Sequence, residues 1–183
     1  NVTGSPFKDM EGHWAEQYTT QLYNLKIING FEENGVYNYH PDENMTRAQF
    51  AVIMANKLGL QSSSEAVLPF EDTNSIPDWA LSAVKAVYES GYVTGSVEAD
   101  GKLYFNPNNP ITRAEAMTLI GRTLSELDED APLDFLDAGE IPEWALIYMR
   151  TLAAKGVING YEGKLMPLAN ITRAEVAKIV ATM

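Results

Sequence analysis

Hydrophobic positions recur at helical spacing along the chain, in pairs of segments separated by polar stretches. In the first segment Trp14, Tyr18 and Leu22 lie four positions apart, so they share one face of a helix. A later segment spaces Phe50 and Ile53 three positions apart and predicts a second helix. The stretch between them is rich in Asn, Gly and Pro, which is typical of a surface loop. The pattern predicts a helix-loop-helix unit whose apolar faces, with most of the tryptophan ring, lie in a core and leave one ring edge at a groove.

This unit is repeated along the chain. The three tryptophans are 65 residues apart, and a glycine follows each of them after 16 residues. A Phe-x-Asp triplet precedes each tryptophan, and a Thr-Arg-Ala-Gln or Thr-Arg-Ala-Glu element follows each loop. Such regular recurrence indicates a repeat architecture, and we expect an all-α fold with pseudo-threefold symmetry. The recurring positions are Asp9, Asp72 and Asp137; Trp14, Trp79 and Trp144; Gly30, Gly95 and Gly160; and Arg47, Arg113 and Arg173.

Two polar segments predict the boundaries between the copies. Residues 61–64 read Gln-Ser-Ser-Ser, and residues 126–132 form an acidic run that ends in proline. Neither composition favours packing into a core. We therefore predict repeats over residues 1–61, 62–128 and 129–183.

The second helix of each copy begins with a predicted capping box. In this motif a threonine hydroxyl accepts a hydrogen bond from the amide three residues later, and a Gln or Glu side chain reaches back to the threonine amide. The pairs are Thr46 with Gln49, Thr112 with Glu115, and Thr172 with Glu175.

Composition and charge exclude several classes of function. The net charge of −12 and the pI near 4.5 disfavour nucleic acids and anionic membrane surfaces as partners. The chain has no cysteine and no apolar stretch long enough to span a bilayer, so disulfides, thiolate metal sites and membrane insertion are not expected. Its two histidines, His13 and His40, both lie in the first copy. No repeated metal site or His-based triad is supported, and we expect neither an enzyme nor a cofactor.

The repeated arginine is the strongest candidate for chemistry. Three of the five arginines directly follow the N-cap threonine, where the helix dipole disfavours a cation. This recurrence suggests an anionic ligand, held by the guanidinium together with free amides at the helix N-terminus. The nearby tryptophan would offer a flat face to a sugar ring, and the aspartate and glycine would complete the site.

Simpler roles stay open for each of these residues. The arginines could lie in solvent or pair with a carboxylate inside the protein. The aspartates could cap the first helix of each copy. The glycines could serve only to supply a positive φ angle after the apolar segment that precedes them.

The order of these motifs resembles the S-layer homology domain, present three times over roughly residues 7–60, 70–127 and 135–183. The resemblance implies a three-pronged spindle in which one helix of each repeat joins a central bundle and grooves lie between the prongs. It also implies an exported bacterial surface protein anchored non-covalently to the cell wall through a secondary cell-wall polysaccharide. The ligand would be a pyruvate ketal on N-acetylmannosamine, with Arg47, Arg113 and Arg173 holding the carboxylate and the tryptophans and glycines shaping the groove.

The copies depart from one another in ways that predict unequal grooves. The first has Gln49 where the others have glutamate, the second has Thr94 where the others have asparagine, and the third has Leu165 in place of an aromatic residue. The alternative function is structural self-assembly, with or without calcium and without specific glycan binding. Lateral contacts with other S-layer subunits are a further expected interaction. No EF-hand-like run of aspartates is present to support a calcium site of high affinity.

Overall fold

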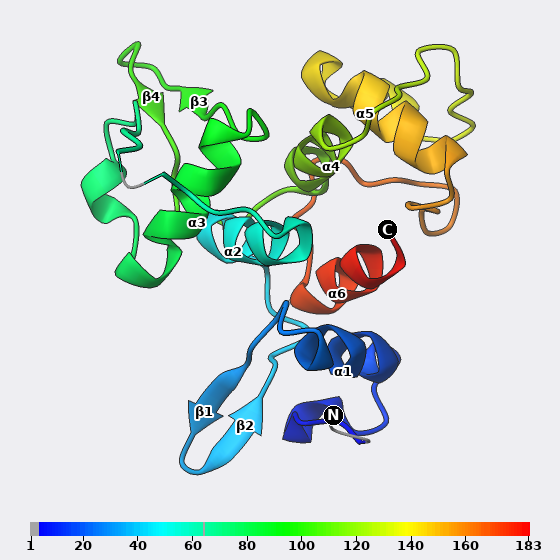
Figure 1. The fold of residues 1–183 in the computed structure, drawn as a ribbon. Coiled ribbons are helices and arrows are strands. Elements are labelled where there is room, and N and C mark those ends of the chain that lie inside the picture. Colours follow the sequence, from blue (N-terminus) through cyan, green and yellow to red (C-terminus); the bar gives the residue numbers. More distant parts are fainter. Residues whose placement is uncertain (1–3, 64) are drawn as a thin grey trace.

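The chain folds into three arms around a common centre (Figure 1). The computed structural model describes residues 4–63 and 65–183, so residues 1–3 of the first predicted repeat and residue 64 in the first predicted linker lie outside it. The described residues form six α-helices: α1 (Glu16–Asn24), α2 (Arg47–Leu58), α3 (Asp78–Glu89), α4 (Arg113–Arg122), α5 (Glu143–Ala154) and α6 (Arg173–Thr182). Short 3-10 helices precede α1, α3 and α5 at Lys8–Met10, Thr73–Ser75 and Ala138–Glu140.

A ring of backbone hydrogen bonds joins the three copies at the centre. The amide of Met45 donates to the carbonyl of Ile171 at 3.0 Å, that of Ile171 to Ile111 at 3.1 Å, and that of Ile111 to Met45 at 2.9 Å. All three side chains are buried. The pseudo-threefold axis predicted from the repeats therefore passes through a closed triangle of extended backbone.

The helices pair between copies. α2 packs against α3, α4 against α5, and α6 against α1, so the second helix of each copy lies on the first helix of the next. The last pair joins the two ends of the chain and closes the ring (Figure 1). Each helix pair therefore buries apolar surface that neither copy could cover alone.

The prediction of an all-α fold is wrong. β1 (Phe31–Glu33) pairs antiparallel with β2 (Val36–Asn38), and β3 (Ser96–Val97) pairs with β4 (Leu103–Tyr104). The first hairpin turns at Asn34 and Gly35, which have φ angles of 52° and 79°. Positive φ angles at both central residues are typical of the type I′ turn, whose twist matches that of the flanking strands. The shorter third loop keeps only the bridge between Tyr161 and Lys164. The Asn-Gly dipeptide was a sequence signal for a hairpin inside the segment predicted as an irregular loop.

The prediction of a mostly buried tryptophan is also wrong. Trp14, Trp79 and Trp144 are 54%, 61% and 53% exposed. The alanine after each tryptophan faces the core instead, and in α3 the fully buried positions are Ala80, Val84 and Val87. Leu22 of the predicted face is fully buried, so the error lies at the tryptophan end of the helix, where the small alanine and not the large ring enters the core.

The predicted helix starts are confirmed, but the reciprocal capping box forms only in the first two copies. The threonine hydroxyls accept from the amides of Gln49, Glu115 and Glu175 at 3.2 Å. In the first two copies Gln49 and Glu115 also reach back to the threonine amide, at 3.0 and 3.1 Å. Within the described residues, no helix is both long enough and apolar enough to cross a membrane.

Candidate functional site

Three equivalent grooves lie at the junctions between the arms. Each takes an arginine from one copy, the backbone turn around the motif glycine from the next copy, and a tryptophan from the third. Their volumes of about 470, 380 and 340 Å³ suit a small ligand such as one or two sugar residues. In the same order, we name them groove A (Arg173, Gly30, Trp79), groove B (Arg47, Gly95, Trp144) and groove C (Arg113, Gly160, Trp14).

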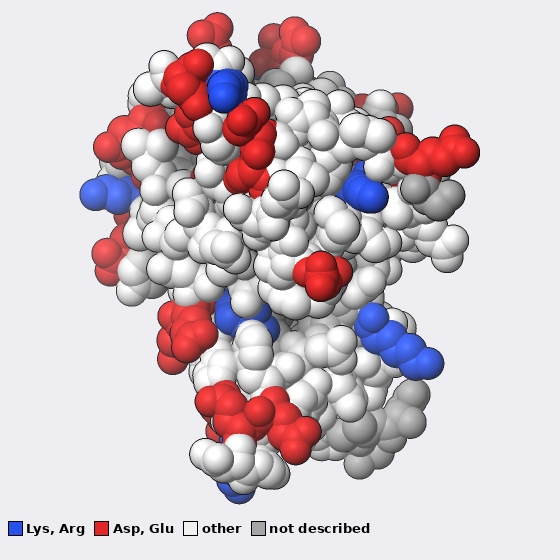
Figure 2. Space-filling view, turned by 90° about the vertical axis from the view of Figure 1, so that its left-hand side faces the viewer, with Lys and Arg blue, Asp and Glu red and all other residues white. Residues whose placement is uncertain are grey.

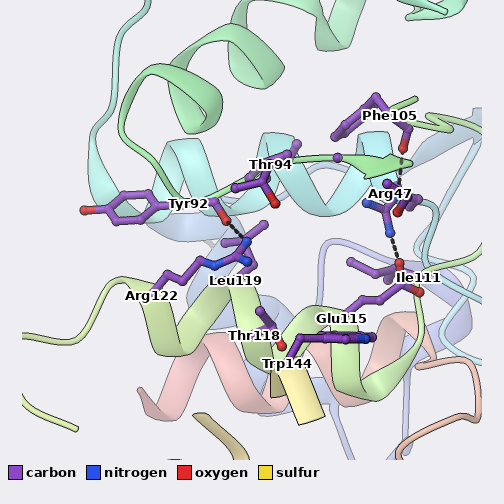
Figure 3. A pocket seen from close by; sticks show the side chains of 14 residues that line it. Arg47, Tyr92, Thr94, Phe105, Ile111, Glu115, Thr118, Leu119, Arg122 and Trp144 are labelled. Atoms are coloured by element: carbon purple, nitrogen blue, oxygen red, sulfur yellow. Dashed lines mark hydrogen bonds and ion pairs between the residues drawn. The ribbon is translucent and has the colours of Figure 1, made fainter. Parts of the chain in front are cut away.

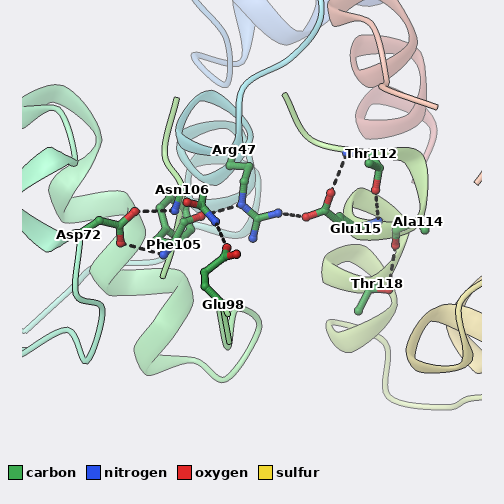
Figure 4. A network of polar contacts seen from close by, with 9 residues as sticks. All are labelled: Arg47, Asp72, Glu98, Phe105, Asn106, Thr112, Ala114, Glu115 and Thr118. Atoms are coloured by element: carbon green, nitrogen blue, oxygen red, sulfur yellow. Dashed lines mark hydrogen bonds and ion pairs between the residues drawn. The ribbon is translucent and has the colours of Figure 1, made fainter. Parts of the chain in front are cut away.

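A relay of hydrogen bonds places each arginine. In groove B both carboxylate oxygens of Asp72 accept from backbone amides, those of Phe105 at 2.9 Å and Asn106 at 2.8 Å. The carbonyl of Phe105 then accepts from Arg47 Nε at 2.7 Å (Figure 4). Asp72 therefore fixes the loop that orients the guanidinium of the neighbouring copy.

The same relay occurs in the other two grooves. Asp9 holds the amides of Tyr39 and His40 at 2.8 Å, and the Tyr39 carbonyl accepts from Arg173 Nε at 2.8 Å. In groove C, Asp137 holds the amides of Leu165 and Met166, and the Leu165 carbonyl accepts from Arg113 Nε. None of the three aspartates caps the first helix of its copy, and none lines a groove. Their part in the site is to position the arginines.

The guanidinium groups differ in their partners. Arg47 forms an ion pair with Glu115, and Arg113 forms one with Glu175, in each case between neighbouring copies. The equivalent position beside Arg173 is Gln49, and no carboxylate of the described residues lies within ion-pair distance of Arg173. The sequence placed these glutamates in a capping box but did not reveal that the same side chains would reach the arginine of another copy.

The amides that begin the second helices are not free to bind an anion, contrary to the prediction. In α2 the amides of Arg47 and Ala48 donate to the carbonyls of Asn109 and Pro107, at 3.0 and 2.9 Å. Equivalent bonds begin α4 and α6. These helix ends are buried at the pseudo-threefold axis, where unpaired donors would carry a desolvation cost. An anion beside these arginines would therefore meet their side chains and not these amides.

The motif glycines allow close packing of an aromatic ring. A Cβ atom on Gly30 would lie 2.4 Å from the Asn38 carbonyl oxygen and 2.5 Å from the Phe7 ring. On Gly95 it would lie 2.5 Å from the ring of Phe70, the phenylalanine of the Phe-x-Asp motif. Gly95 and Gly160 also have positive φ angles, whereas Gly30 does not. The expectation of a positive φ is thus wrong for Gly30, and the shared requirement is space.

The grooves are positive in an acidic protein. Arg122 joins Arg47 in groove B, Lys164 and Lys178 join Arg113 in groove C, and Arg173 is the single charged group that lines groove A. In each groove the basic residues outnumber the carboxylates, while the whole chain carries −12. Figure 2 shows many acidic side chains and few basic ones scattered over one face, with uncharged side chains covering much of the area between them. The extra cations carry no repeated motif, and sequence reasoning missed them.

The arginines of the grooves are largely buried, whereas the tryptophans are exposed. Burial lowers the pKa of Arg173 and of Arg47 below the ordinary arginine value, although nearby acidic groups partly offset it. Both side chains nonetheless stay charged, since arginine is effectively always protonated in proteins. The tryptophans stand open at the rims, and Figure 3 shows Trp144 beside Glu115 on the wall of groove B that faces Arg47 and Phe105. A flat indole face beside a cation is suited to a sugar ring that carries an acidic substituent.

Among the described residues, no group of three or more His, Cys, Asp or Glu is arranged to hold a metal ion.

The fold and the grooves define a closed array of three interlocked repeats with a ligand-sized groove at each junction. The chain belongs to the S-layer homology domain family, whose model matches residues 6–51, 69–117 and 134–177. This membership places it among modules that anchor proteins at the bacterial cell surface, in association with the cell wall.

Its relatives include two surface-layer proteins and an endoglucanase. The chain is 32% identical to the surface-layer 125 kDa protein of Lysinibacillus sphaericus over 94% of its length, and 30% identical to S-layer protein EA1 of Bacillus anthracis over 98%. It is 29% identical to an endoglucanase of Bacillus sp. (strain KSM-635) over 97% of its length. The chain spans only 14%, 20% and 18% of those three proteins, respectively.

Proposed function

We propose that this chain anchors a surface protein by non-covalent binding of a pyruvylated secondary cell-wall polysaccharide in its inter-repeat grooves, and that it has no catalytic role. The observation that carries the proposal is the positive lining of all three grooves in a chain of net charge −12. A pyruvate ketal places a carboxylate on a sugar ring, so one ligand group would meet the arginine while the ring stacks on the tryptophan.

The residues proposed to bind the glycan are the arginines and tryptophans of grooves A, B and C. The glycines and aspartates act through the backbone: Gly30, Gly95 and Gly160 bring the turn close to the ring beneath it, and Asp9, Asp72 and Asp137 position the arginines. Several grooves on one chain would also give a polymer higher avidity than a single sugar, provided that its spacing lets two grooves be filled together.

The experiment compares binding of purified polysaccharide before and after chemical removal of pyruvate. We expect removal to weaken binding about tenfold or more, since charge-assisted hydrogen bonds contribute about 1.5–3 kcal/mol. As a control, the variant Arg150→Ala should bind the intact polymer as tightly as the wild type does. Arg150 donates to the Ala131 carbonyl and lines none of the three grooves. Equal affinity for the intact and the depyruvylated polymer would refute the carboxylate mechanism, and release of new reducing ends from the glycan would refute the non-catalytic role.

A further inference from the structure

Gln49 makes groove A chemically different from the other two. In groove B, Glu115 Oε1 accepts from the Thr112 amide and Oε2 forms the ion pair with Arg47 (Figure 4). In groove A, Gln49 Oε1 likewise accepts from the Thr46 amide at 3.0 Å. Because that amide is a donor, it fixes which end of the Gln49 side chain is oxygen. The amide nitrogen of Gln49 therefore takes the place that the second carboxylate oxygen has in groove B.

Arg173 is left without a direct ion pair as a result, although Glu43 and Asp9 lie near enough to offset part of the lowering of its pKa by burial. It is 4% exposed, and its guanidinium lies 4.9 Å from the centre of the Phe31 ring and 4.5 Å from that of Tyr39. Nε donates to the Tyr39 carbonyl, and the recorded contact of NH1 is the sulfur of Met45 at 3.9 Å, a weak acceptor. A buried charge normally has a charged or strongly hydrogen-bonding partner. Two donor groups, from Gln49 and Arg173, thus line one groove with no carboxylate between them.

We propose that groove A binds a carboxylate more tightly than grooves B and C, because Glu115 and Glu175 act as internal counter-ions that compete with a ligand for Arg47 and Arg113. The inference deepens the proposed function and rests on it for the identity of the natural ligand. Arg173 is the single charged residue lining groove A, so a ligand group with one negative charge matches it. The rest of the lining is apolar side chains and the neutral amides of Asn29, Gln49 and Asn56, which suit the ring and hydroxyl groups of a sugar.

The exposed tryptophans give each groove its own reporter. The indole N–H signals can be assigned with single Trp→Phe variants, and sodium pyruvate titrated into the 183-residue chain serves as the probe. We expect the Trp79 signal to shift at lower pyruvate concentration than those of Trp144 and Trp14. Pyruvate that shifts no indole signal, or shifts all three at the same concentration, overturns the inference.

Two substitutions between glutamine and glutamate test whether the carboxylate beside the arginine controls the response to pyruvate. Gln49→Glu keeps the capping box, as Glu115 does in the second copy, and should weaken the Trp79 response about tenfold or more, because it supplies the missing carboxylate. Glu115→Gln should move the Trp144 response to a lower pyruvate concentration, because it removes the carboxylate that pairs with Arg47. Arg173→Ala should also abolish the Trp79 response, but Arg173 is buried and its loss can unfold the chain, so the Gln49→Glu result decides. An undiminished Trp79 response in folded Gln49→Glu overturns the inference.

The same variants separate this inference from the proposed function. If pyruvate shifts Trp79 while the pyruvylated polysaccharide does not bind, the proposed glycan is wrong and groove A takes another carboxylate. If the polysaccharide binds and Gln49→Glu leaves both its affinity and the Trp79 response unchanged, anchoring stands and the assignment to groove A fails.

Discussion

The carboxylate of Asp137 accepts a hydrogen bond from the amide of Leu165 at 2.9 Å, although the two residues are 28 positions apart. Its second oxygen accepts from Met166 at 2.8 Å. The Leu165 carbonyl in turn accepts from Arg113 of the preceding copy. One buried carboxylate thus connects the start of a repeat, its loop and the arginine of a neighbouring groove.

Replacement of this carboxylate by an amide should be costly. In Asp137→Asn one of the two acceptor oxygens becomes an NH₂ donor facing a backbone donor. We expect a loss of about 1–3 kcal/mol in the free energy of unfolding, the usual cost of an unsatisfied buried polar group. Urea denaturation followed by tryptophan fluorescence measures it. Asp134→Asn is the control, since the exposed Asp134 forms no hydrogen bond or ion pair with another residue that the structure describes, and it should change stability by less than about 0.5 kcal/mol.

The same carboxylate predicts a dependence on pH. Burial alone would raise the pKa of Asp137, but the hydrogen bonds from the Leu165 and Met166 amides hold it below the ordinary aspartate value. A lowered folded-state pKa contributes stability that is fully present above the unfolded pKa of about 4 and is lost as the pH falls through the folded pKa. The stability difference between wild type and Asp137→Asn should therefore be constant near neutral pH and shrink below about pH 4. A difference that grows on acidification would contradict this account.

Gly95 and Gly101 separate backbone strain from steric clash. Both have a φ angle of 77°, but a Cβ on Gly95 would meet Phe70 at 2.5 Å, while one on Gly101 would meet nothing within 4 Å. Gly101→Ala should cost about 1–2 kcal/mol from the left-handed conformation alone. Gly95→Ala should cost at least about 1 kcal/mol more, because the ring or the turn must move. Thermal unfolding of the two variants measures the difference, and equal losses would show that the ring is not tightly held.

Lys26 offers a stabilising substitution. It has a φ angle of 61° just after α1, at the position that Gly91 and Gly156 occupy after α3 and α5. Non-glycine residues are strained there, so Lys26→Gly should raise the free energy of unfolding by about 0.5–1 kcal/mol. Lys26→Ala removes the same charge without relieving the strain and serves as the control. A melting temperature that rises equally in both variants would assign the gain to charge.

Trp79 should matter for binding more than for folding. Its side chain is mostly exposed at the rim of groove A. We expect Trp79→Ala to change stability by less than about 0.5 kcal/mol and to weaken polysaccharide binding by roughly fivefold to twentyfold, the effect of one lost stacking contact. Val67→Ala, a similarly exposed residue outside the grooves, is the control for binding. Calorimetric titration with the pyruvylated polymer would contradict the role of Trp79 if both variants bound equally well.

The sequence by itself determined the threefold repetition, the helix starts and the candidate residues, because these depend on local spacing and on capping within four residues. Its apolar periodicity placed the first helices correctly but assigned Trp14, Trp79 and Trp144 to the wrong side of them. Periodicity alone cannot distinguish two adjacent positions at the start of a helix when one is a large aromatic residue and the other is a small alanine.

Only the tertiary structure decided which copies cooperate in each groove. Arg47 meets Glu115 over 68 positions, and Arg173 meets the Tyr39 carbonyl over 134. Such pairings follow from closure of the ring, in which the last helix packs on the first. Gln49 stands where the other copies have a glutamate, and within one capping box this difference looks minor. Across the ring it leaves the buried Arg173 without a direct ion pair.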